Sequence, residues 1–323
     1  MRGAPNRGRA RRARQRVALY ARRTVRVTAP REIKTPEDLA FLSTAHLAEN
    51  DLEIDLTDVE WISPLGVVAV LATCLRADRE TLDTTVDLPE SREVRTYLAA
   101  IGLLDEVERH GWSLQSNVPE ELVAMQVPGT ALTQSLDLDI DPEATFAPHL
   151  PVSRLASEPE VVEASYLLDE ALHAASLTGG LFDDLIDVAV ELAGNAREHG
   201  SNCYIVAQTH TGRRSRTPGL RLAVADFGAG FARTLQEHYG DMTNSEAIVR
   251  AFEEQVSGTG DKKRGFGLSQ IAGIIDMGPE NVLHIVSWTG NIRRAAGQVQ
   301  VNESASVLFP GTAASVYVPY SPL

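Results

Sequence analysis

The chain has 323 residues, 43% of them hydrophobic, and a net charge of −14. This length and apolar content suffice for two domains with buried cores. No apolar run approaches the roughly 20 residues of a membrane span. The two cysteines, Cys74 and Cys203, lie far apart and fit neither a disulfide framework nor a zinc site. These features argue against a transmembrane protein and predict a cytoplasmic location.

Charge is distributed unevenly along the chain. Residues 1–31 hold eleven arginines and no acid, so this segment carries +11 while the remainder carries −25. We expect a basic, disordered arm that could contact nucleic acid or an anionic membrane surface; upstream sequence from a misassigned start codon is the alternative. The absence of serine argues against a transit peptide. The acidic remainder argues against nucleic acid as a principal ligand, except through the arm.

The first ordered unit is predicted over residues 32–110. Apolar and polar residues alternate in LEIDLTDV from Leu52, as in a half-buried strand, and TVDLP from Thr85 is a second short strand. Helical patterns begin at Gly66 and at Ser91, the latter a residue type that caps helices. The alternation predicts a small α/β domain. Residues 111–149 have no sustained periodicity and are predicted to form a linker or an insertion.

The second predicted unit covers residues 150–323. Helical patterns occupy residues 158–177 and 181–199. Strands are expected to begin at Cys203, Leu220, Val282 and Ser315. Helices combined with largely antiparallel strands predict an α/β sandwich with helices on one face.

The segment ELAGNAREHG, residues 191–200, carries the first chemical pattern. Residues four apart share a helix face, so Glu191, Asn195 and His199 form one polar stripe, with Asp187 one turn earlier. A carboxylate and a carboxamide offer oxygen ligands to Mg²⁺, and the carboxylate could also deprotonate a hydroxyl or a water. An ordinary solvent-facing stripe would have the same pattern, and His199 is explained equally well by capping or packing.

Two glycine-rich segments follow. In LAVADFGAGF an apolar strand leads into Asp226, Gly228 and Gly230, where a buried acid could accept the adenine amine and glycines permit close backbone approach. In SGTGDKKRGFGLSQI a glycine-rich loop enters a helix, which favours anion binding. Its basic residues are either phosphate contacts or solvated charges. Thr312 precedes the last strand and could complete a base pocket.

In this order and spacing, the four segments resemble the N, G1, G2 and last-strand boxes of the GHKL (histidine-kinase-like) ATPase superfamily. The form Glu-x₃-Asn-Ala-x₂-His-Gly is most similar to the anti-sigma-factor serine kinases. The resemblance implies a Bergerat-type α/β sandwich with a mixed sheet over residues 150–323, and ATP and Mg²⁺ as ligands.

The same resemblance implies roles for individual residues. Glu191 would be the catalytic carboxylate and, with Asn195, a magnesium ligand, while Asp226 would bind adenine. Gly265 and Gly267 would lie in a lid loop over the phosphates. The full set of implied nucleotide contacts is Asn195, Asp226, Gly228, Gly230, Gly258, Gly260, Gly265, Phe266, Gly267 and Thr312.

The first unit resembles the STAS domain of anti-sigma-factor antagonists in IDLTDVEWISPLGVVAVL, and VRTYLAAIGLLDEV fits that domain's last helix. In that family the strand leads into an Asp-Ser-(Ser/Thr)-Gly turn. Here the turn reads Ser63, Pro64, Leu65, Gly66, so proline replaces the acceptor serine. The resemblance therefore implies a degenerate interaction or dimerisation domain, in which Ser63 is expected to cap the following helix.

Two functions are compatible with these patterns. One is a Mg-ATP-dependent protein serine/threonine kinase or slow ATPase acting on a protein partner, such as an anti-sigma antagonist or a sigma-like regulator in bacterial signalling. The other is a nucleotide-gated binding switch with little turnover. Glu191 favours chemistry, while the missing acceptor serine favours binding. A sensor histidine kinase fits poorly, because His173 has no helical hairpin around it; a homodimer is compatible with the sequence.

Overall fold

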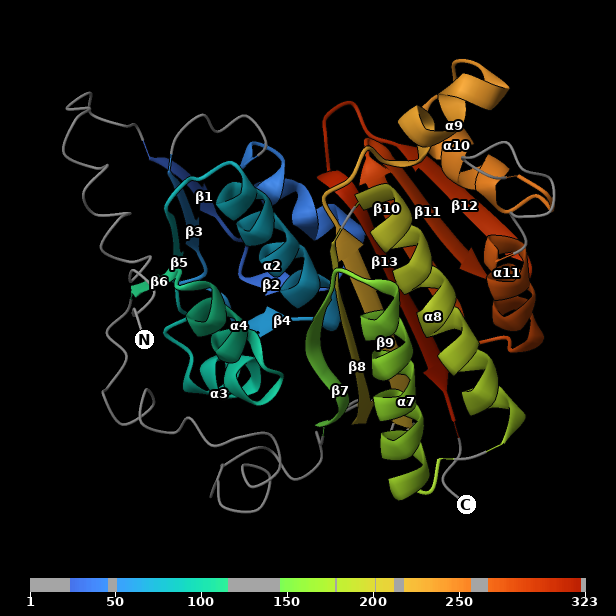
Figure 1. Ribbon diagram of the computed structural model, residues 1–323, viewed down its shortest axis with the longest axis horizontal. Helices are drawn as coiled ribbons and strands as arrows, with labels where there is room; N and C mark the ends of the chain where they lie inside the picture. The colour runs from blue at the N-terminus through green and yellow to red at the C-terminus, as the bar shows by residue number, and fades with distance from the viewer. Residues whose placement is uncertain are drawn as a thin grey trace, which may run out of the picture.

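The computed structural model shows a mixed α/β protein in which two units lie side by side (Figure 1). The residues it describes are 24–45, 51–115, 146–177, 179–200, 202–211, 218–256 and 267–320. Most of the predicted arm and linker therefore lies outside the described residues. Within the described ranges, no helix combines the length and the apolar composition of a membrane span.

The first unit is built on a parallel sheet. Its strands follow the order β1 (Val25–Thr28), β3 (Leu52–Asp55), β5 (Thr84–Asp87) and β6 (Ser113–Gln115). A separate parallel pair consists of β2 (Glu32–Ile33) and β4 (Trp61–Ile62). Since β1 precedes residue 32 and β6 follows residue 110, the sheet extends beyond the predicted domain bounds at both ends.

The helices of the first unit are η1 (Pro36–Leu42), α2 (Pro64–Arg79), α3 (Arg92–Ala100) and α4 (Leu103–His110). The expected cap of α2 is present, because Ser63 Oγ accepts the Gly66 N–H at 3.4 Å. The continuous helix expected from Ser91 is instead two helices. The break lies at Gly102, whose φ of +94° ends the helical backbone conformation.

The second unit contains a seven-stranded, antiparallel sheet. Its order is β12 (Gln298–Glu303), β11 (Gly290–Ala295), β10 (Val282–Trp288), β13 (Phe309–Pro319), β9 (Pro218–Asp226), β8 (Cys203–Thr211) and β7 (Phe146–Leu155). β7 begins within the range predicted as a linker. The sheet is antiparallel throughout, whereas the Bergerat-type expectation was a mixed sheet.

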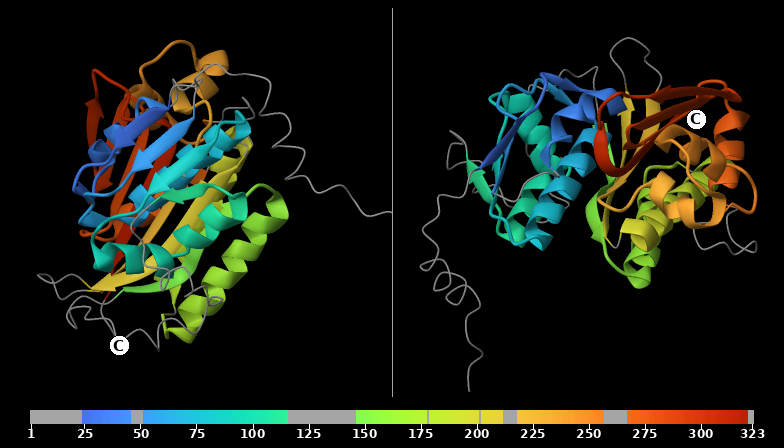
Figure 2. Two further views of the ribbon diagram at one scale, coloured as in Figure 1. Left: turned by 90° about the vertical axis from the view of Figure 1, so that its left-hand side faces the viewer. Right: turned by 90° about the horizontal axis from the view of Figure 1, so that it is seen from above.

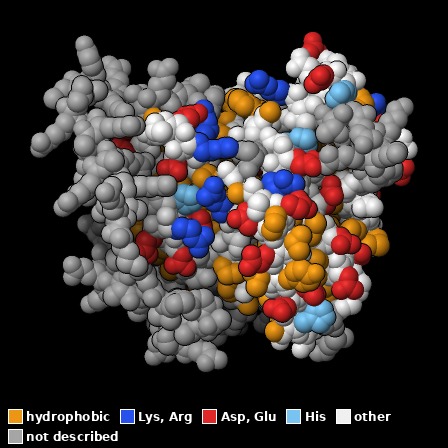
Figure 3. All heavy atoms as spheres, viewed as in Figure 1, with side chains coloured by type: hydrophobic (Ala, Val, Ile, Leu, Met, Phe, Trp, Pro, Cys, Tyr) orange, Lys and Arg blue, Asp and Glu red, His pale blue; other side chains and the backbone are white. Residues whose placement is uncertain are grey.

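Helices cover one face of this sheet (Figure 1). They are α7 (Glu158–Ala174), α8 (Gly180–Gly200), α9 (Phe231–Tyr239), α10 (Asn244–Ala251) and α11 (Gly267–Met277). The outer face of α7 and α8 carries hydrophobic side chains among acidic ones (Figure 3). Among them, Val162, Tyr166 and Leu167 on α7 and Val190 on α8 are exposed.

The opposite face of the sheet packs against the first unit, chiefly against α2 (Figure 2). Side chains alternate between the two faces of a strand. On β9, Ala223 and Ala225 belong to the core shared with the first unit, whereas Leu222 and Val224 belong to the core under the helices. Burial on both faces explains why β9 is apolar at almost every position.

Candidate functional site

Two polar side chains on α8 point away from its buried face. Leu192, Ala193 and Ala196 anchor the helix in the core, while Glu191 and Asn195 remain half-buried one turn apart. The Asn195 Nδ2 donates a hydrogen bond of 2.8 Å to Glu191 Oε1. This bond orients both groups and leaves the Asn195 carbonyl oxygen able to bind a cation or a donor.

The last residue of β9 is a buried acid. The Asp226 side chain is only 3% exposed, and its Oδ1 accepts the Gly228 N–H at 2.6 Å. Burial raises the pKa of Asp226 to about 7, although the Gly228 hydrogen bond opposes this. Thr312 on β13 is the cross-strand neighbour of Asp226. The Asp226 carboxyl, which titrates near neutral pH, and the Thr312 hydroxyl therefore lie on neighbouring strands at one end of the sheet.

The turn after Asp226 is held by the end of β10. Trp288 Nε1 donates to the Ala229 carbonyl at 3.1 Å, and the Phe231 N–H donates to Ser287 Oγ at 3.3 Å. Gly230 has φ +79°, and a Cβ there would lie 2.6 Å from Trp288 Cδ1. Glycine is required at this position for both reasons. The sequence patterns did not single out Ser287 or Trp288 as part of the site.

Gly267, the first residue of α11, lies against Glu191. A Cβ added at Gly267 would be 1.7 Å from Glu191 Cδ and from Oε1. The carboxylate therefore occupies the space beside the beginning of the helix, where the backbone N–H groups have no partner within the helix.

These residues surround one cavity of about 330 Å³. Six of the residues predicted from the sequence line it: Glu191, Asn195, Asp226, Gly230, Gly267 and Thr312. Gly228 is connected to the cavity through its bond to Asp226. The other four predicted contacts, Gly258, Gly260, Gly265 and Phe266, lie outside the described residues.

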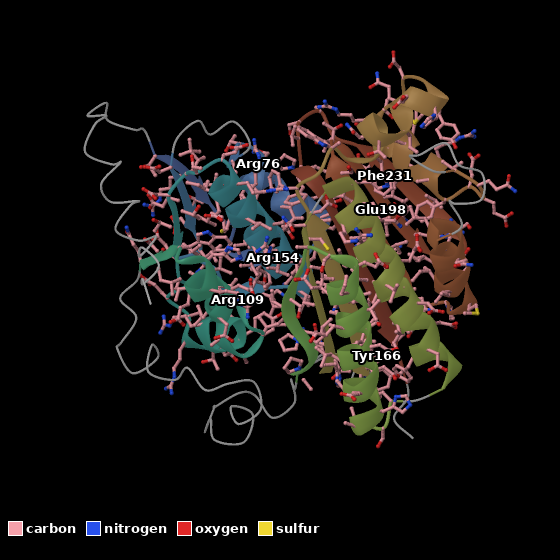
Figure 4. All side chains as sticks on the ribbon, in the orientation of Figure 1. Arg76, Arg109, Arg154, Tyr166, Glu198 and Phe231 are labelled. Carbon is pink, nitrogen blue, oxygen red and sulfur yellow. The ribbon has the colours of Figure 1, made fainter. Side chains whose placement is uncertain are left out.

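Further residues line the cavity that the sequence patterns did not single out, among them Glu198, Phe231, Thr234 and Gln270. Glu198 on α8 and Phe231 at the start of α9 lie near each other at the same end of the helical face (Figure 4). The Thr234 hydroxyl donates to the Gly230 carbonyl at 2.8 Å. Helical spacing from Asn195 and from Gly230 would have been a usable signal for Glu198 and Thr234. His199, ambiguous from sequence, also lines the cavity.

The donor atoms around the cavity suit a cation that retains other ligands. Glu191 and Asn195 supply oxygen atoms from adjacent turns, while the described part of the chain contains no cluster of three or more His, Cys, Asp or Glu suited to a metal. Ca²⁺ normally takes six to eight oxygen ligands, and zinc takes nitrogen and sulfur. The pair fits Mg²⁺, which is commonly held by one or two side chains together with water and phosphate oxygens.

The cavity combines a buried acceptor, a glycine-lined wall, a helix beginning and an oxygen pair. These groups could receive a ligand that has an amino group at one end and an anion with a cation at the other. We compared the chain with protein-family models, with curated proteins and with solved structures. None of the three comparisons finds a match.

Proposed function

We propose that the second unit is a GHKL-type domain with a Bergerat-type sandwich that binds Mg-ATP. The observation that carries the proposal is convergence: Glu191, Asn195, Asp226, Gly267 and Thr312, far apart in sequence, line one cavity. Its volume of about 330 Å³ is within the range of small-molecule sites. A solvent-facing stripe on α8 would not explain why the other segments meet it.

Asp226 is the proposed adenine acceptor. Its carboxyl is buried and, among the described residues, accepts a hydrogen bond only from Gly228, so it can accept one from the exocyclic amine. Thr312 lies beside it on the adjacent strand. Gly230 also lines the cavity, although its missing Cβ leaves space for Trp288 and not for the base.

The phosphates would lie between α8 and the beginning of α11. Backbone N–H groups at the first turn of α11 attract anions. Asn195 and Glu191 would hold Mg²⁺, which neutralises phosphate charge when bound. Glu191, oriented by Asn195 at 2.8 Å, is also the group placed to accept a proton from an attacking hydroxyl or water.

We infer a regulatory protein kinase, or a slow ATPase, acting on a protein partner in the cytoplasm, with an anti-sigma antagonist or sigma-like regulator as the partner class. The first unit, as a degenerate STAS-like module, is a poor substrate, because Ser63 is only 8% exposed and caps α2. The exposed apolar side chains of α7 offer a surface for a partner or a second copy.

A nucleotide-gated switch is the second candidate, favoured by one observation. α2 of the first unit packs on β9 and β13, and the ends of these strands carry Asp226 and Thr312. A change at the nucleotide end of the strands could therefore alter how the first unit docks, without turnover.

The test is incubation with Mg²⁺ and γ-labelled ATP of the wild type, Asn195→Ala and Glu191→Ala, following free phosphate and protein-bound label with and without lysate of the source organism. Asp187→Asn is the matched control, because Asp187 is on the same stripe of α8 but outside the cavity lining. Product lost in the first two variants and kept in the control supports an enzyme. ATP binding without product supports the switch, and absence of ATP binding overturns both.

A further inference from the structure

A second cavity, of about 190 Å³, lies where the two units meet. It is on the face of the sheet opposite to the helices. The lining residues that bear on ligand binding are Lys34, Ser63, Arg221, His284, Arg293 and Tyr317. The first two come from the first unit and the other four from the sheet, so the cavity exists only while the units are docked.

Strand register places the four sheet residues on one face. Arg221 on β9 is the cross-strand partner of Tyr317 on β13, and His284 on β10 is the partner of Arg293 on β11. His284 is also opposite Ser315, two residues before Tyr317. Directly opposite residues in antiparallel strands project to the same side. Arg221, His284 and Arg293 therefore extend toward the first unit from three strands.

Positive charge in this cavity is not balanced by its own walls. Three basic side chains line it and no carboxylate does. Lys34 pairs with the exposed Glu32 at 2.7 Å. Among the described residues, neither Arg221 nor Arg293 has a carboxylate within the 4.0 Å of an ion pair. In a chain of net charge −14, a cavity whose charged lining side chains are all cationic is a specific feature.

The environment of Arg221 favours the binding of an anion. Its guanidinium carbon lies 4.7 Å from the centroid of the Tyr317 ring, which fixes the plane of the group. Burial lowers the pKa of Arg221, and burial, reinforced by Arg293 and Arg221 and opposed by Glu37, lowers the pKa of His284 to about 4. His284 is therefore neutral at pH 7, with ring nitrogens for hydrogen bonding.

We propose that this cavity binds a phosphate-sized oxyanion, either free or as the phosphoryl group of a small metabolite, between the first unit and the sheet. The planar guanidinium of Arg221 offers paired N–H donors that match phosphate oxygens, with Arg293 and Lys34 adding charge. Ser63 marks the beginning of α2, whose positive end adds to the same field.

The site would strengthen docking of the two units. A ligand that contacts residues of both units binds the docked arrangement more tightly than a separated one, and it stabilises that arrangement by mass action. This inference does not depend on nucleotide binding in the other cavity, because no residue lines both.

The test is thermal unfolding of the full-length chain in phosphate, sulfate or glycerol phosphate, each against chloride at equal ionic strength. At a phosphate concentration tenfold above Kd, we expect the melting temperature of the wild type to rise by about 2 °C. Arg221→Gln and Arg293→Gln should lose this rise. Arg250→Gln removes the same charge from the distant helix α10 and should keep it, and Asn195→Ala should keep it because the phosphate is not in the nucleotide cavity.

A second readout covers the case in which Arg221→Gln destabilises the fold. The imidazole resonances of His284, assigned with His284→Gln, should shift on addition of phosphate in the wild type and not in Arg293→Gln, whose altered side chain is exposed. Glycerol phosphate acting more strongly than phosphate identifies a metabolite as the source. A rise in melting temperature that persists in both arginine variants, or no rise and no His284 shift with any oxyanion, overturns the proposal.

Discussion

Gly267 lies so close to Glu191 that an added Cβ would be 1.7 Å from the Glu191 carboxyl carbon. The atoms in its way belong to the end of a flexible side chain, not to backbone. Glu191 can therefore move aside, but only by giving up its position beside Asn195 and the beginning of α11. The contact thus constrains the chemistry of the cavity more than the stability of the fold.

We accordingly expect Gly267→Ala to separate activity from stability. The free energy of unfolding should change by less than about 1 kcal/mol, because alanine favours a helix over glycine and offsets the displaced contact. If Glu191 has the proposed catalytic role, phosphate release from ATP should fall at least about tenfold, since a small misplacement of a catalytic group has large effects. Gly273→Ala, in the same helix with nothing within 4 Å, is the control. Equal activity of the two variants would contradict the proposed role of Glu191.

Gly230→Ala should destabilise the protein more than Gly240→Ala. The two glycines bound α9 with nearly the same backbone, φ +79° and ψ 168° against φ +81° and ψ −176°, so each substitution incurs a similar conformational cost of about 1–3 kcal/mol. Only at Gly230 does a Cβ meet the Trp288 ring, at 2.6 Å. Overpacking adds about 1–3 kcal/mol. Chemical denaturation of both variants measures the difference in the free energy of unfolding. Equal decreases would show that the Trp288 side chain moves aside at little energetic cost.

The parts of the site carried by short segments could be predicted from the sequence. Helical spacing put Glu191 and Asn195 on one face, and the strand-then-glycine pattern put Asp226 at the end of a strand; both placements are found. Ser287 and Trp288 could not be identified this way. Their contact with the turn depends on β10 pairing with β13 and on the irregular register between these two residues, which is a long-range relationship.

The same limit applies to the fold. β12 was not predicted, because Val299 and Val301 alternate with glutamines over only four residues and all six residues of the strand are exposed. The docking of α2 on the sheet was not predicted either, although β9 held a signal. Its run of Leu222, Ala223, Val224 and Ala225 is apolar on both faces, which indicates a strand covered on both sides.

Tyr204→Phe tests how firmly the two units are joined. The Tyr204 hydroxyl on β8 donates to Oε2 of Glu106 at 3.1 Å, and Glu106 on α4 is only 1% exposed. Removing the donor leaves a buried carboxylate with one partner fewer, which should cost about 1.5–3 kcal/mol. Tyr97→Phe removes a hydroxyl that donates across the same junction to the neutral Gln208 at 3.1 Å, and should cost about 1 kcal/mol. Thermal unfolding ranks the two, and a reversed order would contradict the larger contribution expected of the bond to the Glu106 carboxylate.

We expect Asp226→Asn to weaken ligand binding and to change how the stability of the protein depends on pH. Burial raises the pKa of Asp226 to about 7 from an ordinary value of about 4, so between these pH values the folded protein binds more protons than the unfolded chain. The stability of the wild type should therefore fall as pH rises from about 4 to about 7, by up to about 4 kcal/mol.

Asparagine in place of Asp226 has no charge to bury, so the variant should lack this part of the pH dependence and be more stable than the wild type at pH 8. Its ATP affinity should fall at least about tenfold, because an amide is a weaker acceptor for the adenine amine than a carboxylate. Denaturant titrations at pH 5 and pH 8, with ATP binding at pH 8, measure both effects. Asp187→Asn, which alters an exposed acid of α8, should change neither. A variant that gains stability at pH 8 but keeps full ATP affinity would confine Asp226 to a structural role and remove it from the proposed adenine site.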